Sequence, residues 1–181
     1  VPDQYRQDFT ADRVQGALDA SHWKGKLVAA PFWANTQLLW YRKSVAEKAG
    51  LDMSGPVTFD QVIAAAQATG KDIALQAKRY EGYTVFINAL VASAGGSIIE
   101  NEGAAAADTQ LGLDTPAGKR AATLISSLAR SEAVGPALSS MNETNALNMF
   151  QDESTSGFML NWPYVYAATK GNDVPFMDDI A

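Results

Sequence analysis

The sequence predicts an α/β fold. Short runs of large apolar residues alternate with longer segments whose apolar residues recur at helical spacing. This alternation continues along most of the chain, which favours helices layered against a sheet. Hydrophobic residues make up 47% of the 181 positions, and a chain of this length buries roughly 70% of its surface on folding. A packed core is therefore expected.

The first expected elements lie before residue 32. A helix is predicted over 8–20, because Val14, Ala17 and Leu18 form one apolar stripe. A strand is predicted over 25–31 after a turn.

The next elements have clear boundaries. A strand over 37–42 is followed by a short helix over 44–49, which ends before Gly50 as a helix C-terminus commonly does. Thr58 and Gln61 have the spacing of a capping box and predict a helix that begins at Thr58.

Later segments continue the alternation of strands and helices. The elements expected there are the end of that helix at Gly70, a strand over 72–76, a helix over 81–94, a strand over 97–99, a loop over 100–113, a helix over 116–131, a helix over 142–151 and a strand over 157–160.

Composition excludes several functions. The net charge is −6 with no basic cluster, which argues against nucleic acid as a partner. No apolar run is long enough to span a bilayer. The chain has no cysteine and lacks phosphate-loop, dinucleotide and zinc-helix motifs, so we expect no metal, no cofactor and no catalytic residue.

The most informative stretch is 158–166, where an apolar run ends at Asn161 and aromatic rings follow at Trp162 and Tyr164. Rings with hydrogen-bonding tips suit a ligand that has apolar faces and polar rims, as sugars do. A cluster of rings that caps the core explains the same residues equally well.

Other aromatic, amide and acidic residues also fall at expected element ends, where binding residues concentrate. The candidate ligand-binding residues are Trp33, Asn35, Glu81, Tyr83, Glu143, Asn161, Trp162 and Tyr164. Structural roles remain open for several of them: Trp33 as core, Asn35 as a turn residue, Tyr83 as packing and Glu143 as a helix-capping charge.

Two other functions remain open at this point. Glu81 and Glu143 are the one carboxylate pair that we consider for a glycoside hydrolase, whose carboxyl groups are related by distance in space and not by sequence. A structural interaction domain, with all of its aromatic residues in the core, is the other alternative.

The order of several segments resembles the extracellular solute-binding proteins of sugar ABC importers, the maltose-binding-protein-like family. The segments that carry the resemblance are 24–31, 39–43, 57–62, 92–96, 117–121, 149–151 and 158–163. Each segment alone is weakly specific, but they occur in the family's order over nearly the whole chain.

The resemblance implies a periplasmic-binding-protein-like fold of two α/β lobes with a sugar between them and no catalysis. Residues 1–36 would be the tail of the first lobe with a hinge crossing near 28–36, and 37–181 would be most of the second lobe. A full member of the family has roughly twice this length, so we expect a fragment cut at both ends.

The resemblance also implies roles for single residues. Asn35 falls where the family has a polar sugar ligand near the hinge, and Glu143 falls on another sugar contact. Tyr164 falls on a stacking aromatic residue with Trp162 beside it. Glu81 and Tyr83 fall near a further contact patch, although this chain lacks the family's proline-interrupted pair of aromatic residues there.

Within the family, 33–35 and 161–164 most resemble the trehalose-binding lipoproteins. The resemblance implies a disaccharide ligand, trehalose first, and ABC permease subunits as partners. It also implies an extracytoplasmic location with a lipid anchor outside this chain.

Overall fold

The computed structural model describes residues 2–181, which form two compact units that divide between Thr36 and Gln37. The first unit contains two short helices, α1 (Arg6–Thr10) and α2 (Gln15–Ala20), and a two-residue hairpin of β1 (His22–Trp23) and β2 (Lys26–Leu27).

Two predictions for this first unit are wrong. The single helix expected over 8–20 is broken, because Asp12 takes a left-handed conformation with φ 54°, which a continuous α-helix does not accommodate. The strand expected over 25–31 is only two residues long, since its pairing with β1 ends at Leu27.

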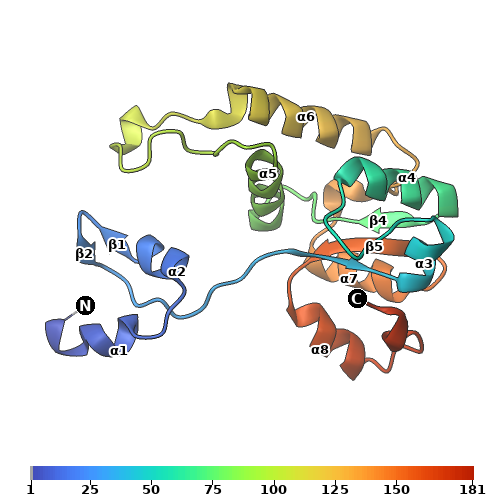
Figure 1. The fold of residues 1–181 in the computed structure, drawn as a ribbon, viewed down its shortest axis with the longest axis horizontal. Helices are drawn as coiled ribbons and strands as arrows, with labels where there is room; N and C mark the ends of the chain where they lie inside the picture. Colours follow the sequence, from blue (N-terminus) through green and yellow to red (C-terminus); the bar gives the residue numbers. More distant parts are fainter. Residues whose placement is uncertain (1) are drawn as a thin grey trace. The chain divides into compact units, whose positions relative to one another are not determined.

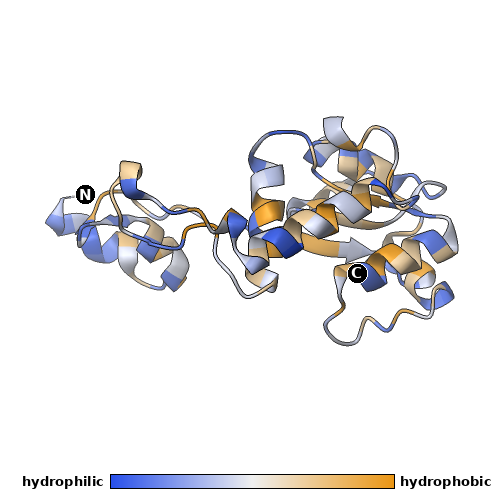
Figure 2. Ribbon diagram, turned by 90° about the horizontal axis from the view of Figure 1, so that it is seen from above, coloured by the Kyte–Doolittle hydropathy of each residue, from blue (hydrophilic) through white to orange (hydrophobic). Residues whose placement is uncertain are grey.

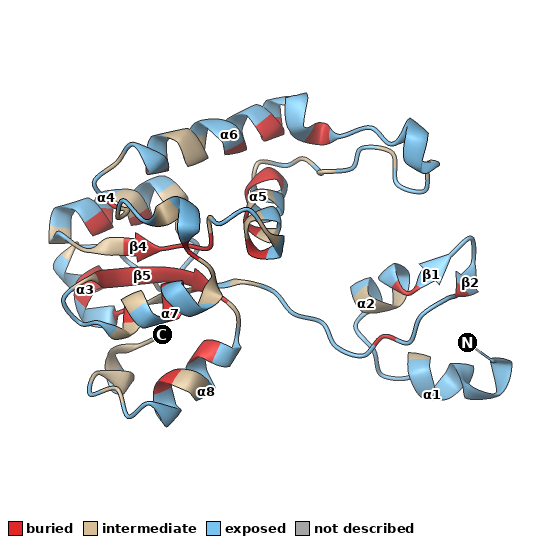
Figure 3. Cartoon of the chain, turned by 180° about the vertical axis from the view of Figure 1, so that it is seen from behind, coloured by how far each residue is buried: buried red, intermediate tan, exposed pale blue. Residues whose placement is uncertain are grey.

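The second unit is built on a three-stranded sheet of β3 (Leu38–Tyr41), β4 (Asp72–Ala74) and β5 (Ser156–Asn161). The strand order is β3-β5-β4, so β5 is central, antiparallel to β3 and parallel to β4. All six residues of β5 are buried (Figure 3).

Helices cover both faces of this sheet (Figure 1). They are α3 (Lys43–Lys48), α4 (Phe59–Thr69), α5 (Glu81–Ser93), α6 (Pro116–Ala129), α7 (Glu143–Gln151) and α8 (Tyr164–Gly171). Because side chains alternate along a strand, Phe158 and Leu160 pack with α3, α4, α5 and α6, while Met159 packs with α7 and α8. Hydrophobic residues therefore gather along the strands of this unit (Figure 2).

Local signals explain where the helices of this unit begin and end. The capping box predicted at the start of α4 is confirmed: Gln61 N donates to Thr58 Oγ1 at 3.2 Å, and Thr58 N donates to Gln61 Oε1 at 2.8 Å. Gly70 ends α4 in the left-handed conformation with φ 63°, and Gly50 follows α3 with φ 69°.

Two further predictions for this unit need correction. The strand expected over 97–99 is a single bridge between Ile99 and Leu111, and the loop over 100–113 contains two 3₁₀ turns. Helix α8 was not predicted, because the aromatic residues after Asn161 were interpreted by their chemistry and not by the apolar face on which Val165 is buried.

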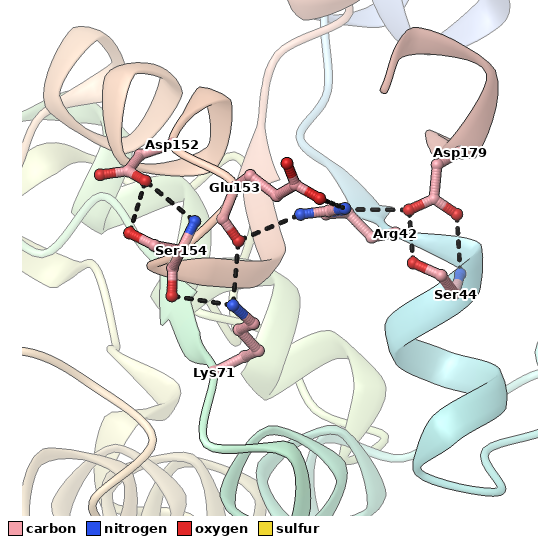
Figure 4. A network of polar contacts seen from close by, with 7 residues as sticks. All are labelled: Arg42, Ser44, Lys71, Asp152, Glu153, Ser154 and Asp179. Carbon is pink, nitrogen blue, oxygen red and sulfur yellow. Dashed lines mark hydrogen bonds and ion pairs between the residues drawn. The ribbon is translucent and has the colours of Figure 1, made fainter. Parts of the chain in front are cut away.

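A buried arginine holds the last residues of the chain against β3 (Figure 4). Arg42 is 5% exposed, and its Nε donates to Asp179 Oδ2 at 3.1 Å while its other nitrogens donate to Glu153. Asp179 also accepts from the backbone and the hydroxyl of Ser44. Burial alone would raise the pKa of Asp179, but the Ser44 hydrogen bonds and the Arg42 charge outweigh it and lower the pKa.

Candidate ligand-binding site

The candidate site lies where the two parallel strands of the second unit end. Gln76 follows β4, and Asn161 is the last residue of β5. Their side chains meet, because Gln76 Nε2 donates to Asn161 Oδ1 at 2.9 Å. In open α/β sheets, ligands bind outside the carboxyl ends of the strands, and that is the position of this pair.

Glu143 is brought to the same place by its position as the first residue of α7. Its backbone carbonyl accepts from Asn161 Nδ2 at 2.9 Å and from the Tyr164 hydroxyl at 3.3 Å. Its carboxylate accepts from the Tyr80 hydroxyl at 2.6 Å. Residues from β5, from α8 and from the segment before α5 are thus linked to Glu143 at the start of α7.

Tyr80 is the link between Glu143 and Gln76. Its hydroxyl lies 2.6 Å from Gln76 Oε1 as well as from the Glu143 carboxylate, and it accepts the backbone N–H of Glu143 at 3.1 Å. Burial, reinforced by Glu143, raises the pKa of Tyr80 far above its ordinary value of 10.0. The hydroxyl therefore stays protonated and remains a hydrogen-bond donor across the physiological pH range.

Aromatic surface lies next to this polar cluster. Trp162 is half-buried, and Tyr164 is 41% exposed. Burial and the charge of Glu143 raise the pKa of Tyr164, only partly offset by a hydrogen bond involving Asn161. The exposed ring area beside a carboxylate can contact an apolar C–H face while the carboxylate accepts a hydroxyl hydrogen bond.

The structure brings four of the predicted site residues together: Glu143, Asn161, Trp162 and Tyr164. Asn161 is fully buried, and its oxygen also accepts the backbone N–H of Trp162 at 2.8 Å. Its amide therefore holds neighbouring residues of the site in place by hydrogen bonds and is not exposed to a ligand.

The remaining predicted residues lie apart from this cluster or at its margin. Glu81 is exposed at the start of α5. Tyr83 lines a different cavity of about 370 Å³ together with Phe86 and Leu128.

Trp33 and Asn35 belong to the first unit. Trp33 is 78% exposed and lines a cavity of about 160 Å³. Asn35 is exposed, and its Oδ1 accepts the backbone N–H of Thr36 at 3.1 Å.

Gln76 and Tyr80 were not among the predicted site residues. Tyr80 stands next to Glu81 in a segment that was already of interest, so its aromatic and polar character was a usable signal. Gln76 offered a weaker one, an amide directly after an apolar strand. Its role depends on Asn161, 85 positions later in the chain.

Among residues 2–181, no three His, Asp or Glu side chains gather as metal ligands would. None of the helices described there has the length and apolarity that a bilayer crossing requires.

Known proteins are similar to this chain in sequence and in fold. A probable ABC transporter-binding protein of Deinococcus radiodurans is 29% identical over 167 residues, which cover 86% of this chain and 38% of that protein. The maltose-bound structure of T. maritima MalE3 matches with a TM-score of 0.80 and 26% identity, covering 98% of this chain and 45% of that one.

A solute-binding protein of Agrobacterium vitis with bound D-mannitol matches with a TM-score of 0.72 and 23% identity, covering 97% of this chain and 44% of that one. The chain thus spans less than half the length of these relatives. Its fold is that of the maltose-binding-protein-like periplasmic binding proteins, as the sequence predicted.

The family model that matches the chain describes bacterial extracellular solute-binding proteins, and the match extends over residues 1–181. Such proteins bind their solutes without transforming them, which removes the support for a glycoside hydrolase. The chain belongs to the family of bacterial extracellular solute-binding proteins.

Proposed function

We propose that the protein containing this chain is the solute-binding component of a sugar ABC importer, located outside the cytoplasm, and that it captures a disaccharide for a membrane permease. The observation that carries this proposal is the acidic and aromatic cluster of Glu143, Trp162 and Tyr164 at the ends of two parallel strands. Membership of the solute-binding family and the maltose bound to the T. maritima relative support it.

In this proposal, the two units belong to different lobes. Residues 37–181 are the larger part of the second lobe, and 1–36 are the tail of the first lobe with a hinge crossing near 28–36. The division of the chain into compact units at Thr36 is consistent with this assignment. Closure of the lobes around the sugar would present the closed form to the permease.

Each side chain has a distinct task in the proposed complex. Tyr164 and Trp162 stack on a pyranose face, each contact contributing about 1 kcal/mol by analogy with aromatic pairs. Glu143 accepts hydroxyl hydrogen bonds. Trp33, Asn35, Glu81 and Tyr83 are further proposed contacts.

Trehalose is the proposed ligand, because 33–35 and 161–164 resemble the trehalose-binding lipoproteins of the family. The same resemblance is the ground for proposing a lipid anchor outside this chain.

The test is a titration of the full-length protein with trehalose, maltose and D-mannitol, followed by tryptophan fluorescence. We expect a saturable change with trehalose and no breakdown of the sugar. D-mannitol has hydroxyls but no ring face, so it should change the tryptophan fluorescence of the protein only weakly. A fluorescence response to maltose alone would identify maltose, and not trehalose, as the ligand. No response to either disaccharide would contradict the proposed function.

The matched variants are Trp162→Ala and Trp23→Ala. Trp23 is 54% exposed in the first unit and lies outside every proposed contact. Trp162→Ala should weaken trehalose binding by about tenfold, which corresponds to about 1.4 kcal/mol, while Trp23→Ala leaves it unchanged. Equal trehalose affinities of the two variants would show that Trp162 does not contact the sugar.

A further inference from the structure

The hydrogen bonds around Asn161 leave only one possible orientation for its amide. Its Oδ1 accepts the backbone N–H of Trp162, and its Nδ2 donates to the backbone carbonyl of Glu143. Reversing the amide would place donor against donor and acceptor against acceptor. Because Asn161 is fully buried, water cannot compensate such a mismatch.

The orientation of Gln76 follows from that of Asn161. Asn161 Oδ1 is an acceptor, so the atom of Gln76 that faces it at 2.9 Å is the donor Nε2. The other end of this amide, Oε1, then faces the Tyr80 hydroxyl. Gln76 is 1% exposed, so its oxygen depends on a donor from the protein.

Tyr80 thus has one proton and two acceptors. Gln76 Oε1 and Glu143 Oε2 each lie 2.6 Å from its oxygen, and the remaining contact, from the Glu143 N–H, is one that Tyr80 accepts. Whichever of these two acceptor oxygens receives the Tyr80 proton, the other receives no hydrogen bond from Tyr80. Within residues 2–181, no side chain or backbone N–H donates to the second carboxylate oxygen, Glu143 Oε1.

The cluster is therefore short of donors. Gln76 Oε1 is buried and depends on Tyr80 for a donor, whereas the carboxylate of the half-buried Glu143 is the acceptor left for a donor from outside the protein. A hydroxyl group that donates to the Glu143 carboxylate would allow Tyr80 to donate to Gln76, so that both acceptors are satisfied. A group that only accepts hydrogen bonds cannot do this.

We propose that Tyr80 and Gln76 are positioning residues that hold Glu143 as a hydrogen-bond acceptor, so that the site selects solutes by a hydroxyl donor at this point. This inference rests on the proposed function, since it assumes a polyhydroxylated solute. Tyr80 acts through Glu143: it fixes the carboxylate through Oε2 and the first turn of α7 through the Glu143 N–H.

The test is a double-mutant cycle of Tyr80→Phe and Glu143→Ala in the full-length protein, with trehalose and maltose as probes. Tyr80→Phe keeps the ring but removes the hydroxyl, and we expect roughly tenfold weaker binding. In the Glu143→Ala background the same change should have no further effect, because the group through which Tyr80 acts is gone.

A matched control and a second readout distinguish this role from a purely structural one. Tyr166→Phe removes a hydroxyl from a tyrosine that is 55% exposed on α8, and it should leave affinity unchanged. Analogues of the probe sugar in which single hydroxyls are replaced by fluorine can accept but not donate. Fluorine at one of the hydroxyl positions of the sugar should weaken binding to the wild-type protein at least tenfold. The same analogue should bind Glu143→Ala almost as well as the unmodified sugar does.

Gln76→Glu supplies an independent variant, because a carboxylate cannot donate to Asn161 Oδ1 and the fixed orientation is lost. Weaker binding by this variant is expected. Additive losses in the cycle, or a Tyr80→Phe affinity equal to that of Tyr166→Phe, would overturn the inference while leaving the proposed function intact. A wild-type protein that binds neither sugar would overturn both.

Discussion

At the scale of single residues, Gly82 leaves the space that the Tyr80 hydroxyl occupies. A Cβ built on Gly82 would lie 2.6 Å from the Tyr80 hydroxyl oxygen and would also collide with Gln76 Oε1. The bond between these two side chains therefore requires glycine at this position, two residues after Tyr80. Gly82 thus affects Glu143 indirectly, through Tyr80.

Gly82→Ala should weaken sugar binding by at least about tenfold, because Tyr80 and Gln76 must both move away from the new methyl group. Gly55→Ala is the matched control, since no atom lies within 4 Å of a Cβ at that position. Both variants should be measured by titration with trehalose and by thermal unfolding. Equal affinities would show that the position of Tyr80 does not matter for binding.

Asp179 gives the second unit a pH-dependent component of stability. Its pKa in the folded protein lies below the ordinary value of 3.8, so the folded state favours the charged form. The stabilisation is present above about pH 3.8 and is lost as the pH falls through the lower folded pKa.

We therefore expect the free energy of unfolding to fall as the pH is lowered below about 4, with a smaller fall in Asp179→Asn. Ser44→Ala removes a 2.6 Å hydrogen bond to the same carboxylate and should give an intermediate result. Chemical denaturation at several pH values measures this. An identical acid response of all three proteins would contradict the assignment.

At the scale of elements, the segment after α8 is attached to β3 by Arg42. Its side chain lies 4.2 Å from the centroid of the Phe176 ring, and the backbones of Tyr41 and Ala181 exchange two hydrogen bonds. Arg42 thereby connects β3, the turn after α7 and the last residues of the chain. Removing its charge would leave Asp179 without its buried cationic partner.

Arg42→Met should lower the free energy of unfolding by about 1–3 kcal/mol, because it leaves the half-buried Asp179 carboxylate without its cationic partner. Lys119→Met is the control. Lys119 pairs with Asp114 at the surface, where both side chains are exposed, and such pairs contribute about 0–1 kcal/mol. Urea denaturation of both variants is the measurement, and equal losses would contradict the role of Arg42.

Elements whose boundaries depend on neighbouring residues were predictable from the sequence. The capping box of Thr58 and Gln61 joins residues three positions apart, so α4 could be placed correctly. Helix α8 was missed because its single buried stripe is short and follows an aromatic segment with an obvious alternative interpretation. The break at Asp12 depends on one backbone conformation that composition does not indicate.

The site itself was only partly predictable. The acidic and aromatic side chains of the site suggest sugar binding by their chemistry alone, without knowledge of the fold. They are those of Glu143, Trp162 and Tyr164. The supporting residues acquire their roles from long-range pairing: Tyr80 meets Glu143 across 63 positions, and Gln76 meets Asn161 across 85. The parallel pairing of β4 with β5 creates these contacts, and no local pattern encodes it.

At the scale of the whole molecule, the unit 37–181 presents hydrogen-bond acceptors and aromatic rings together, and in the proposed function the rest of the protein supplies further contacts to the sugar. The chain covers 45% of the T. maritima relative, so most of such a protein lies outside it. We propose that the sugar is held at Glu143, Trp162 and Tyr164.

The measurement that tests this claim most directly is a crystal structure of the full-length protein grown with trehalose, or with maltose if that sugar binds more tightly. We expect a sugar ring against Tyr164 or Trp162 and a sugar hydroxyl within hydrogen-bond distance, roughly 2.6–3.2 Å, of the Glu143 carboxylate. Sugar bound elsewhere, for instance in the apolar cavity beside Tyr83 and Phe86, with the Glu143 carboxylate still bonded only to Tyr80, would contradict the account.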